Sequence, residues 1–545
     1  MERRIWNRPP RSARAVATLV LANSFLLVPI WILNRGFGPH LLALEAAILT
    51  AAFLLLPASL WTRLAAWACG FLVVVVSVLE LGDTTARMSL ARPLNLYLDI
   101  QLLSAVANLL RGTLGAFVGT LVLAGGLIAL LSVGALLGFL LSTLHPEPAR
   151  RRQSIAGAVA LGIVLAAVPA RWLHPSGVAL GLPAVQLARE QVRHVRSMMQ
   201  ENDRFTAEMA AAPDRYSGTP GLLDGLDGRD VILAFVESYG ISALNDDRYA
   251  PTILPRLASM LESFEDAGLY VVTGQLVAPS QGGMSWLGHG SILSGLWLEN
   301  QLRYDLLLAS DRQTLVDDFE AAGYRTTALM PAITMAWPEG ERFGYERIYA
   351  WQDIAYAGPP LNWVTMPDQF TWSYLERTIR GLDDRPLFAE VGLISSHAPW
   401  TPILPVLEDW ESIGDGEVFA PFADAGETPE ELWRDGDRVR EHYALAVGYA
   451  IDAMASYAAR YVDDNTVLIA LGDHQPAPLI TGDDASRAVP VHVIARDPDV
   501  LEPFLRWDFL PGALPPERDG EGRRMDTFRD WFVNAYSGSA TEGGP

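Results

Sequence analysis

The stretch DVILAFVES, residues 230–238, is an apolar run of strand length that ends in a glutamate and a serine. A strand that helices cover on both faces of a sheet has this nearly continuous pattern. Similar runs follow along the chain, at 268–277, 324–330, 386–396 and 465–473. Segments with helical spacing, such as RQTLVDDFEAAG and DAMASYAARYV, separate the runs. This alternation predicts an α/β sandwich with a mostly parallel sheet.

Two of these predicted strands end in side chains that can bind a metal. Glu237 follows the first run directly, and Asp473 and His474 follow the run NTVLIALG. Because ligands in open α/β sheets bind beyond the carboxyl ends of the strands, we expect these groups at one edge of one sheet. Two carboxylates and an imidazole suit a divalent ion such as Mn²⁺ or Zn²⁺. Each residue taken alone is equally typical of a capping or surface role.

A glycine-rich turn, PSQGGMSWLGHGSILSGL at 279–296, leads into a predicted helix. Gly282 and Gly283 permit a tight backbone, and Ser285 then stands at the helix N-terminus, where backbone N–H groups and the dipole favour an anion. A phosphate attacked by Ser285 would lie there, and the alternative is that Ser285 is an ordinary N-cap. His289 lies four residues later on the same helix face, where it would touch substrate or cap a neighbouring group.

Two further histidines belong to predicted strands or their ends. His397, in LISSHAPW, comes directly after a strand, beside Pro399 and Trp400. It would contact a phosphate or a leaving group, or it would serve only the structure. His492 lies inside the strand VPVHVIA, and we interpret it as structural.

The N-terminal third has a different composition, because Leu, Val, Ala, Ile and Gly dominate from Ala13 to Leu173. A helix needs about 20 apolar residues to cross the hydrocarbon core of a membrane. Five segments have this character, at 15–33, 41–60, 64–81, 114–141 and 155–173. We therefore predict an α-helical membrane domain with five transmembrane helices. The first segment is too long for a cleavable signal peptide, and no small-residue cleavage site follows it.

Arginines in the short loops predict the orientation of these spans. The N-terminus, Arg63 and the loop at 150–152 carry them, and five spans place all three on one side, which should be cytoplasmic. The chain after the last span then lies outside the cytoplasm of a bacterial-type plasma membrane. The predicted domains are a transmembrane domain at 1–174, a connector helix and linker at 175–225, and an extracytoplasmic domain at 226–545.

The charge and the cysteine count narrow the class of protein. The net charge of −22 argues against nucleic acid as a partner, because phosphate backbones are bound by Lys and Arg. The single cysteine, Cys69, excludes a disulfide within the chain. The outer domain, of about 350 residues, must therefore be stabilised by its core alone.

Taken together, these motifs resemble the sulfatase-like branch of the alkaline phosphatase superfamily. The resemblance is strongest to its membrane-bound phosphoglycerol and phosphoethanolamine transferases, including lipoteichoic acid synthases. It extends over 230–499 and rests on ILAFVESYG, the glycine-rich turn, ISSHAPW and LGDHQPA. A five-helix anchor before an outer domain is also similar to that family. The resemblance implies a catalytic domain of the alkaline phosphatase and sulfatase type.

The resemblance also implies a role for each candidate residue. Glu237, Asp473 and His474 would bind the metal. Ser285 would be the nucleophile, in place of the family's threonine, with its oxygen also on the metal. His397 would lie near the transferred phosphoryl group. A metal lowers the pKa of the hydroxyl, and its attack on phosphorus gives a covalent phosphoserine intermediate.

The sequence departs from the family pattern in three places. Leu287 and His289 stand where sulfatases have Pro or Ala and then Arg, which disfavours a sulfatase. The disulfides usual in phosphoethanolamine transferases are missing. The family's Trp-x-Arg phosphate contact has no clean match, since MAWPEGERFGY offers Trp337 and Arg342 at another spacing.

We therefore expect transfer of a phosphoglycerol-type or phosphoethanolamine group from a lipid donor to an envelope glycan or lipid acceptor. The partners would be the lipid bilayer, the donor headgroup and that acceptor. The alternative is a membrane-anchored phosphodiesterase or phosphatase, or another sulfatase-like hydrolase, because water can resolve the same intermediate. A third hypothesis, an inactive sensor with this fold, is disfavoured by the intact Glu237, Ser285, Asp473 and His474.

Overall fold

A computed structural model describes most of the chain, at residues 10–33, 40–99, 106–108, 110–111, 114–145, 179–211, 216, 218–517 and 522–538. The chain divides into two compact units. The N-terminal unit comprises Met1–Met88 and Arg92–Glu201, and the C-terminal unit comprises Ser89–Ala91 and Asn202–Pro545. The division falls inside helix α8 (Pro183–Ala211), in the region predicted as a connector helix.

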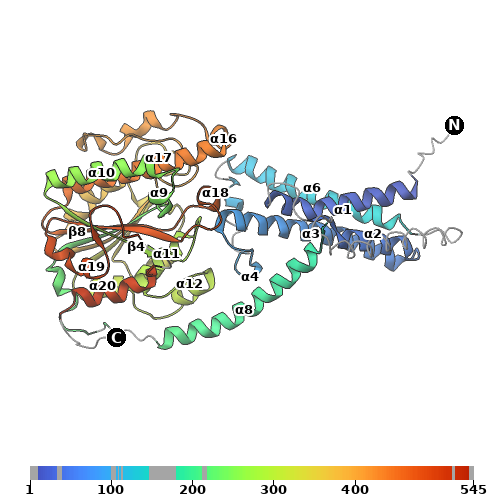
Figure 1. Cartoon of the computed structure of the whole chain (residues 1–545), viewed down its shortest axis with the longest axis horizontal. Helices are drawn as coiled ribbons and strands as arrows, with labels where there is room; N and C mark the ends of the chain where they lie inside the picture. The colour runs from blue at the N-terminus through green and yellow to red at the C-terminus, as the bar shows by residue number, and fades with distance from the viewer. Residues whose placement is uncertain are drawn as a thin grey trace. The chain divides into compact units, whose positions relative to one another are not determined.

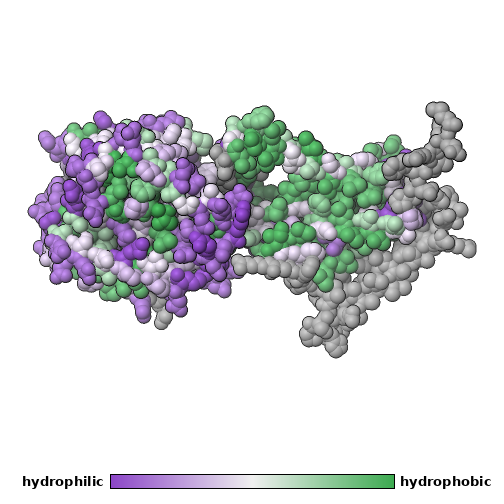
Figure 2. All heavy atoms as spheres, turned by 90° about the horizontal axis from the view of Figure 1, so that it is seen from above, coloured by the Kyte–Doolittle hydropathy of each residue, from purple (hydrophilic) through white to green (hydrophobic). Residues whose placement is uncertain are grey.

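Three helices of the N-terminal unit are long and apolar enough to cross a membrane: α1 (Arg11–Leu33), α3 (Leu60–Leu90) and α6 (Ala116–Ser142). Many of their Leu, Val and Phe side chains are exposed, which is typical of helices that contact lipid. In Figure 2 the surface of these helices is largely green, whereas that of the C-terminal unit is largely purple. The remaining elements of this unit are short, namely β1 (His40–Ala43), α2 (Leu44–Leu55), α4 (Leu96–Asp99) and β2 (Ala179–Gly181).

The predicted count of five spans is not confirmed. The first, third and fourth predicted spans are confirmed as apolar helices of spanning length. The second predicted span, 41–60, contains only the 12-residue helix α2, since its first residues form β1, which pairs with β2. The fifth predicted span, 155–173, lies outside the described residues.

Small residues let two of the long helices pack closely. A Cβ atom at Gly70 of α3 would lie 2.4 Å from the Gly138 nitrogen of α6, and one at Gly138 would lie 2.9 Å from the Trp67 Cα. Without a hydrophobic driving force inside lipid, such close backbone contact is how apolar helices associate. The Gly-rich sequence of the predicted fourth span therefore has a packing role.

The C-terminal unit is built on an eight-stranded sheet in the order β10-β4-β9-β8-β3-β7-β5-β6. The strands β8, β3, β7, β5 and β6 run parallel, and β9 is antiparallel to both of its neighbours. The mostly parallel sheet predicted from the sequence is therefore confirmed. The strands are β3 (Asp230–Val236), β4 (Tyr270–Val277), β5 (Arg325–Met330), β6 (Arg347–Ala350), β7 (Leu387–Leu393), β8 (Thr466–Gly472), β9 (Ala488–Ala495) and β10 (Leu510–Pro511).

Helices cover both faces of this sheet (Figure 1). Successive side chains of β3 alternate between two cores, since Ile232 and Ala234 enter one and Val231 and Leu233 enter the other. This alternation explains why the strand reads as a continuous apolar run. One core includes α10 (Ala250–Ala267), α15 (Asp368–Tyr374) and α17 (Gly436–Tyr461), and the other includes α11 (Ser285–Ser294), α12 (Gln301–Leu308), α13 (Leu315–Ala321), α19 (Glu502–Arg506) and α20 (Phe528–Tyr536).

Short helices complete the connections between these elements. They are α9 (Ser242–Asn245), α14 (Pro338–Phe343), α16 (Pro429–Leu432) and α18 (Pro478–Thr481). The loops that leave the carboxyl ends of the five parallel strands all meet at one edge of the sheet, which we call the carboxyl edge.

Candidate metal centre

Glu237 and Asp473 lie side by side at the carboxyl edge because β3 and β8 are neighbours. The two strands pair in parallel up to Val236 and Gly472, so that the next residue of each strand is a carboxylate. Two backbone N–H groups hold Asp473, since Ser238 N and His474 N donate to its Oδ1 at 2.8 and 2.7 Å. Ser238 adopts a left-handed conformation, with φ of 55°, and this turn aims its N–H at Asp473.

His474 presents an unpartnered nitrogen to both carboxylates. Its Nδ1 lies 2.9 Å from Gln475 O, a contact that requires a proton on Nδ1. The other nitrogen, Nε2, is buried without a hydrogen-bond partner and lies 3.6 Å from both Glu237 Oε1 and Asp473 Oδ2. A buried polar atom is normally satisfied. The free Nε2 facing two carboxylates is therefore the arrangement that a bound cation would complete.

The three residues fit a divalent metal. One ligand atom from each of Glu237, Asp473 and His474 lies within 4.8 Å of the other two. Asp473 and His474 are almost fully buried, at 2% and 1% exposed, so that water cannot satisfy them. Two carboxylate oxygens and one imidazole nitrogen form a ligand set that suits Mn²⁺ or Zn²⁺.

The charges of the cluster shift its pKa values in opposite directions. Burial alone would raise the pKa of Glu237, but the charges of His474 and His397, together with hydrogen bonds to Ser238 and Asp473, lower it to about 2. Burial, and then repulsion by Glu237, raise the pKa of Asp473 to about 6. Two carboxylates in one buried site cannot ionise independently. This electrostatic conflict is what a positive ion between them would relieve.

Ser285 faces the same cluster from the first turn of α11. Its Oγ lies 3.4 Å from Glu237 Oε2, and the side chain makes no cap hydrogen bond, because Met284 is the N-cap residue. Gly288, one turn later, packs on β8, and a Cβ there would lie 2.7 Å from Asp473 O. Residues three apart share a helix face. The close approach at Gly288 therefore aims Ser285 at the carboxylates.

His397 belongs to the same edge through the loop after β7. The buried carboxylate of Asp368, at the start of α15, accepts Ile394 N and Ser395 N at 2.7 and 2.8 Å and so fixes this loop. The ring of His397 is exposed, and its charge helps to lower the pKa of Glu237. His397 thus lies near the cluster, on its solvent side.

His289 is held by a buried network that the sequence analysis did not predict. Its Nδ1 lies 2.7 Å from Oε1 of Glu390, which is 1% exposed in the middle of β7, and Tyr345 donates to the other carboxylate oxygen. The ring stacks on Phe235, with centroids 3.7 Å apart. The charge of His289 also lowers the pKa of Asp473. A lone glutamate inside the apolar strand LFAEVGL was the available sequence signal for this network.

Trp337 is the N-cap residue of α14, and Arg342 lies in the last turn of that helix. Arg342 Nε donates to Leu308 O of α12 at 2.9 Å, and Trp337 packs partly buried against the core. Among the described residues, no hydrogen bond or ion pair joins either side chain to Glu237, Asp473 or His474. The structure therefore brings together Glu237, Ser285, Asp473, His474, His397 and His289, and it leaves these two outside that group.

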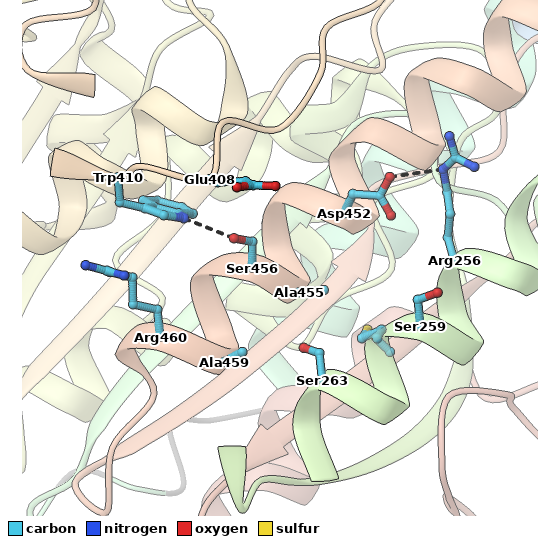
Figure 3. Close-up of a pocket in the computed structure, with 11 residues that line it drawn as sticks. Arg256, Ser259, Ser263, Glu408, Trp410, Asp452, Ala455, Ser456, Ala459 and Arg460 are labelled. Carbon is cyan, nitrogen blue, oxygen red and sulfur yellow. Dashed lines mark hydrogen bonds and ion pairs between the residues drawn. The ribbon is translucent and has the colours of Figure 1, made fainter. Parts of the chain in front are cut away.

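A cavity of about 610 Å³ lies elsewhere, between α10 and α17 (Figure 3). Small side chains such as Ser259, Ser263 and Ala455 line it, together with Arg256 and Asp452, whose Nε and Oδ2 lie 3.1 Å apart. None of the predicted site residues lines this cavity. We call it the α10–α17 groove.

No model of a known protein family matches the sequence, and no curated protein sequence matches it. Solved structures do match part of the chain. The lipoteichoic acid synthase LtaP of Listeria monocytogenes is 13% identical, with a TM-score of 0.34, over 49% of this chain and 65% of that protein. The phosphoglycerol transferase GacH of Streptococcus pyogenes, solved with sn-glycerol-1-phosphate, is 13% identical, with a TM-score of 0.35, over 55% of this chain and 74% of that protein.

A third match is the periplasmic domain of EptC from Escherichia coli in complex with Zn, which is 14% identical, with a TM-score of 0.35. It covers 57% of this chain and 82% of that domain. An alkaline phosphatase superfamily protein of Vibrio parahaemolyticus is also matched, and this chain covers 60% of its length. All four matches have TM-scores between 0.31 and 0.35, so the superfamily of this chain stays a prediction from its motifs. At such identities the likeness concerns the fold alone.

Proposed function

We propose that the chain is a metal-dependent transferase of the sulfatase-like type. It would move a phosphoglycerol-type or phosphoethanolamine group from a membrane lipid to an envelope glycan or lipid. The unpartnered Nε2 of His474, facing Glu237 and Asp473 beside the Ser285 hydroxyl, carries this proposal. A nucleophile next to a cation site is what phosphoryl transfer requires, because the reaction depends on positioning and charge neutralisation.

In the first half-reaction, Ser285 would attack phosphorus. A bond between Ser285 Oγ and phosphorus forms as the bond between phosphorus and the diacylglycerol oxygen breaks. In the net reaction, the proton of the serine hydroxyl is transferred to the departing alkoxide, and diacylglycerol is released. Glu237, Asp473 and His474 would hold a divalent metal, which lowers the hydroxyl pKa and neutralises the phosphoryl oxygens when bound.

In the second half-reaction, a hydroxyl of the acceptor would attack the phosphoserine and restore Ser285. Water in place of the acceptor would make the enzyme a phosphodiesterase, which is the alternative function. The exposed His397 would contact the phosphoryl group from the solvent side, and His289, held by Glu390, would present Nε2 to it from α11. Trp337 and Arg342 would contact the substrate only after α14 moves, since Arg342 donates to Leu308 O.

The three long apolar helices support a membrane anchor, and we propose that it lies in a bacterial-type plasma membrane with the C-terminal unit outside the cytoplasm. An anchor keeps the nucleophile near a lipid donor at high effective concentration. Nucleic acid is not a proposed partner, because the net charge is −22.

The test uses the full chain reconstituted in phosphatidylcholine vesicles that contain either phosphatidylglycerol or phosphatidylethanolamine. Each preparation is incubated with Mn²⁺, with Zn²⁺ or with a chelator. Diacylglycerol without an equal amount of free headgroup phosphate supports transfer, whereas equal amounts of both support the diesterase. No diacylglycerol from either lipid with either metal would contradict both.

Mass spectrometry of the protein tests the nucleophile separately. We expect a headgroup phosphate adduct on the peptide that contains Ser285, and no adduct in the Ser285→Ala variant. The matched control is Ser259→Ala, a serine of the α10–α17 groove, which should form the adduct like the parent. An unchanged adduct in Ser285→Ala would show that another residue is the nucleophile.

A further inference from the structure

Exposed tryptophans gather at the carboxyl edge of the sheet. In the described part of the C-terminal unit, Trp286, Trp351, Trp363 and Trp433 are between 39% and 45% exposed. Met335, in the loop after β5, is 68% exposed. Trp351 directly follows the carboxyl end of β6, and Trp286 follows Ser285. We call these five side chains the apolar rim.

Two rim tryptophans flank the loop that carries His397. Trp433 Nε1 lies 3.3 Å from Pro399 O, and its ring stacks on the buried Trp400 at 5.8 Å and 5°. On the other side, Asn362 Nδ2 donates to Thr401 O at 2.7 Å, which places the adjacent Trp363 beside the same loop. The Trp433 ring is thus held by the loop that carries a candidate phosphate contact, and Trp363 follows a residue that is bonded to the same loop.

The other rim members are fixed in the same way. Trp286 Nε1 donates to Gln301 Oε1 at 2.9 Å, while the ring stays partly exposed next to the nucleophile. Trp351 N donates to Ile333 O at 3.0 Å and so joins the loop after β6 to the loop that contains Met335. The rim is therefore contributed by loops after β5, β6 and β7 and by the start of α11.

Outside the rim, the described part of the C-terminal unit has no exposed tryptophan. Its other exposed large apolar side chains among the described residues are leucines and Tyr270, which begins β4 at the opposite edge of the sheet. Tryptophan concentrates at the boundary between lipid and water, because its ring is apolar and its N–H is polar. Exposed apolar area on an acidic, otherwise polar unit marks an interaction site.

We infer that the apolar rim inserts into the headgroup layer of a lipid bilayer and so brings a lipid phosphodiester to Ser285. The inference deepens the proposed function and rests on its lipid donor. The rim attaches through apolar side chains rather than through a basic patch. Attachment therefore persists at high salt, unlike binding that depends on anionic headgroups.

The depth of the rim is measured without any catalysis, in the full chain reconstituted in vesicles of phosphatidylcholine and phosphatidylglycerol. The single native cysteine is removed by Cys69→Ser, and one cysteine is introduced by Trp363→Cys or Trp433→Cys and labelled with an environment-sensitive fluorophore. The matched control is Tyr270→Cys, an exposed aromatic at the opposite edge. Nitroxide-labelled lipids should quench both rim labels and leave the Tyr270 label unaffected, at low and at high salt.

The inference would be overturned if a water-soluble quencher reached the rim labels as fully as the Tyr270 label. It would also be overturned if protection of the rim labels from this quencher rose with the protein-to-lipid ratio, because a second copy of the chain would then cover the rim.

A kinetic measurement separates folding from docking. Trp363→Ser should raise KM for vesicle lipid about tenfold, since about 1.4 kcal/mol of burial is lost. It should raise KM for the soluble diester bis-para-nitrophenyl phosphate much less, whereas Tyr270→Ser should change neither.

Equal losses on the two substrates would mean that Trp363 serves the chemistry or the fold and not the lipid. If neither substrate is turned over by the parent protein, the proposed function fails. The depth measurement then still decides whether the rim contacts lipid.

Discussion

The carboxyl edge and the α10–α17 groove both hold charged side chains, yet these charges are paired differently. At the carboxyl edge, His474 Nε2 is buried without a partner between two carboxylates. In the groove, Arg256 Nε likewise makes no hydrogen bond, but it forms an ion pair with Asp452 Oδ2 at 3.1 Å, and Trp410 Nε1 donates to Ser456 Oγ at 3.0 Å (Figure 3). The side chains of Arg256 and Asp452 are also partly exposed, so that water can form hydrogen bonds with them. A buried imidazole nitrogen that faces two carboxylates, rather than a large volume, therefore distinguishes the candidate metal centre.

The largest difference between the two regions is expected when one aspartate in each is replaced by asparagine. Asp473→Asn should lower activity by about a thousandfold and weaken binding of Mn²⁺ or Zn²⁺, because it removes a negative ligand from a buried cation site. Asp452→Asn in the groove should change neither quantity. Activity on lipid vesicles and isothermal titration with each metal are the measurements. Equal effects of the two substitutions would remove the distinction between the regions.

Matched glycines test whether α11 must approach β8 closely. Gly288→Ala places a Cβ 2.7 Å from Asp473 O, which is backbone and cannot yield, so α11 and Ser285 must shift. A displacement of about 1 Å should cost about a hundredfold in kcat. Gly448→Ala in α17 meets only the flexible end of Arg256 and should leave kcat unchanged.

The glycine pair is informative only if both variants are folded, which thermal unfolding followed by tryptophan fluorescence reports. A folded Gly288→Ala variant with full kcat would show that the position of Ser285 does not depend on this contact.

Matched glutamates test the network behind His289. Glu390→Gln should lower kcat about tenfold, because a partner that orients a functional imidazole is worth roughly 10- to 100-fold. The neutral amide keeps the size of the side chain but weakens its contact with His289 Nδ1, now 2.7 Å. Glu408→Gln in the groove is the control and should have no effect on kcat. A change in Tm without a change in kcat would assign Glu390 to the fold alone.

The smallest expected effect concerns the groove itself. Burial raises the pKa of Asp452 although Arg256 opposes the shift, so that ionised Asp452 slightly destabilises the folded state at neutral pH. Asp452→Asn should therefore be as stable as the parent at pH 7 or slightly more stable, by less than about 1 kcal/mol. The difference should shrink as the pH falls through the folded pKa and vanish below the unfolded value of about 3.9. A clear loss of stability at neutral pH would mean that the Arg256 pair outweighs burial.

The sequence predicted the strands of the parallel sheet, and the residues that end them, because both depend on local pattern. Apolar runs of strand length mark β3 and β8, and parallel strands that are neighbours must present their next residues at one edge. The glycines before Ser285 predicted the turn into α11. Three of the predicted spans matched described helices, at α1, α3 and α6.

Local pattern failed where a residue's role depends on a distant neighbour. The apolar segment at 41–60 was predicted to span, but its start pairs with β2, more than a hundred residues away. Glu390 contacts His289 across a sequence separation of 101 residues, and no spacing rule predicts such a pair.

By itself, the sequence determined which residues end β3 and β8, that α11 begins at Ser285 and which segments are apolar, since these follow from period and composition. Only the tertiary structure decided that His474 Nε2 lies unpartnered between Glu237 and Asp473, and that the exposed tryptophans share one edge. The physical reason is strand order. The pattern of a strand determines which residues stand at its end. The neighbours of β3, which are β8 on one side and β7 on the other, are determined only by long-range pairing that no local segment encodes.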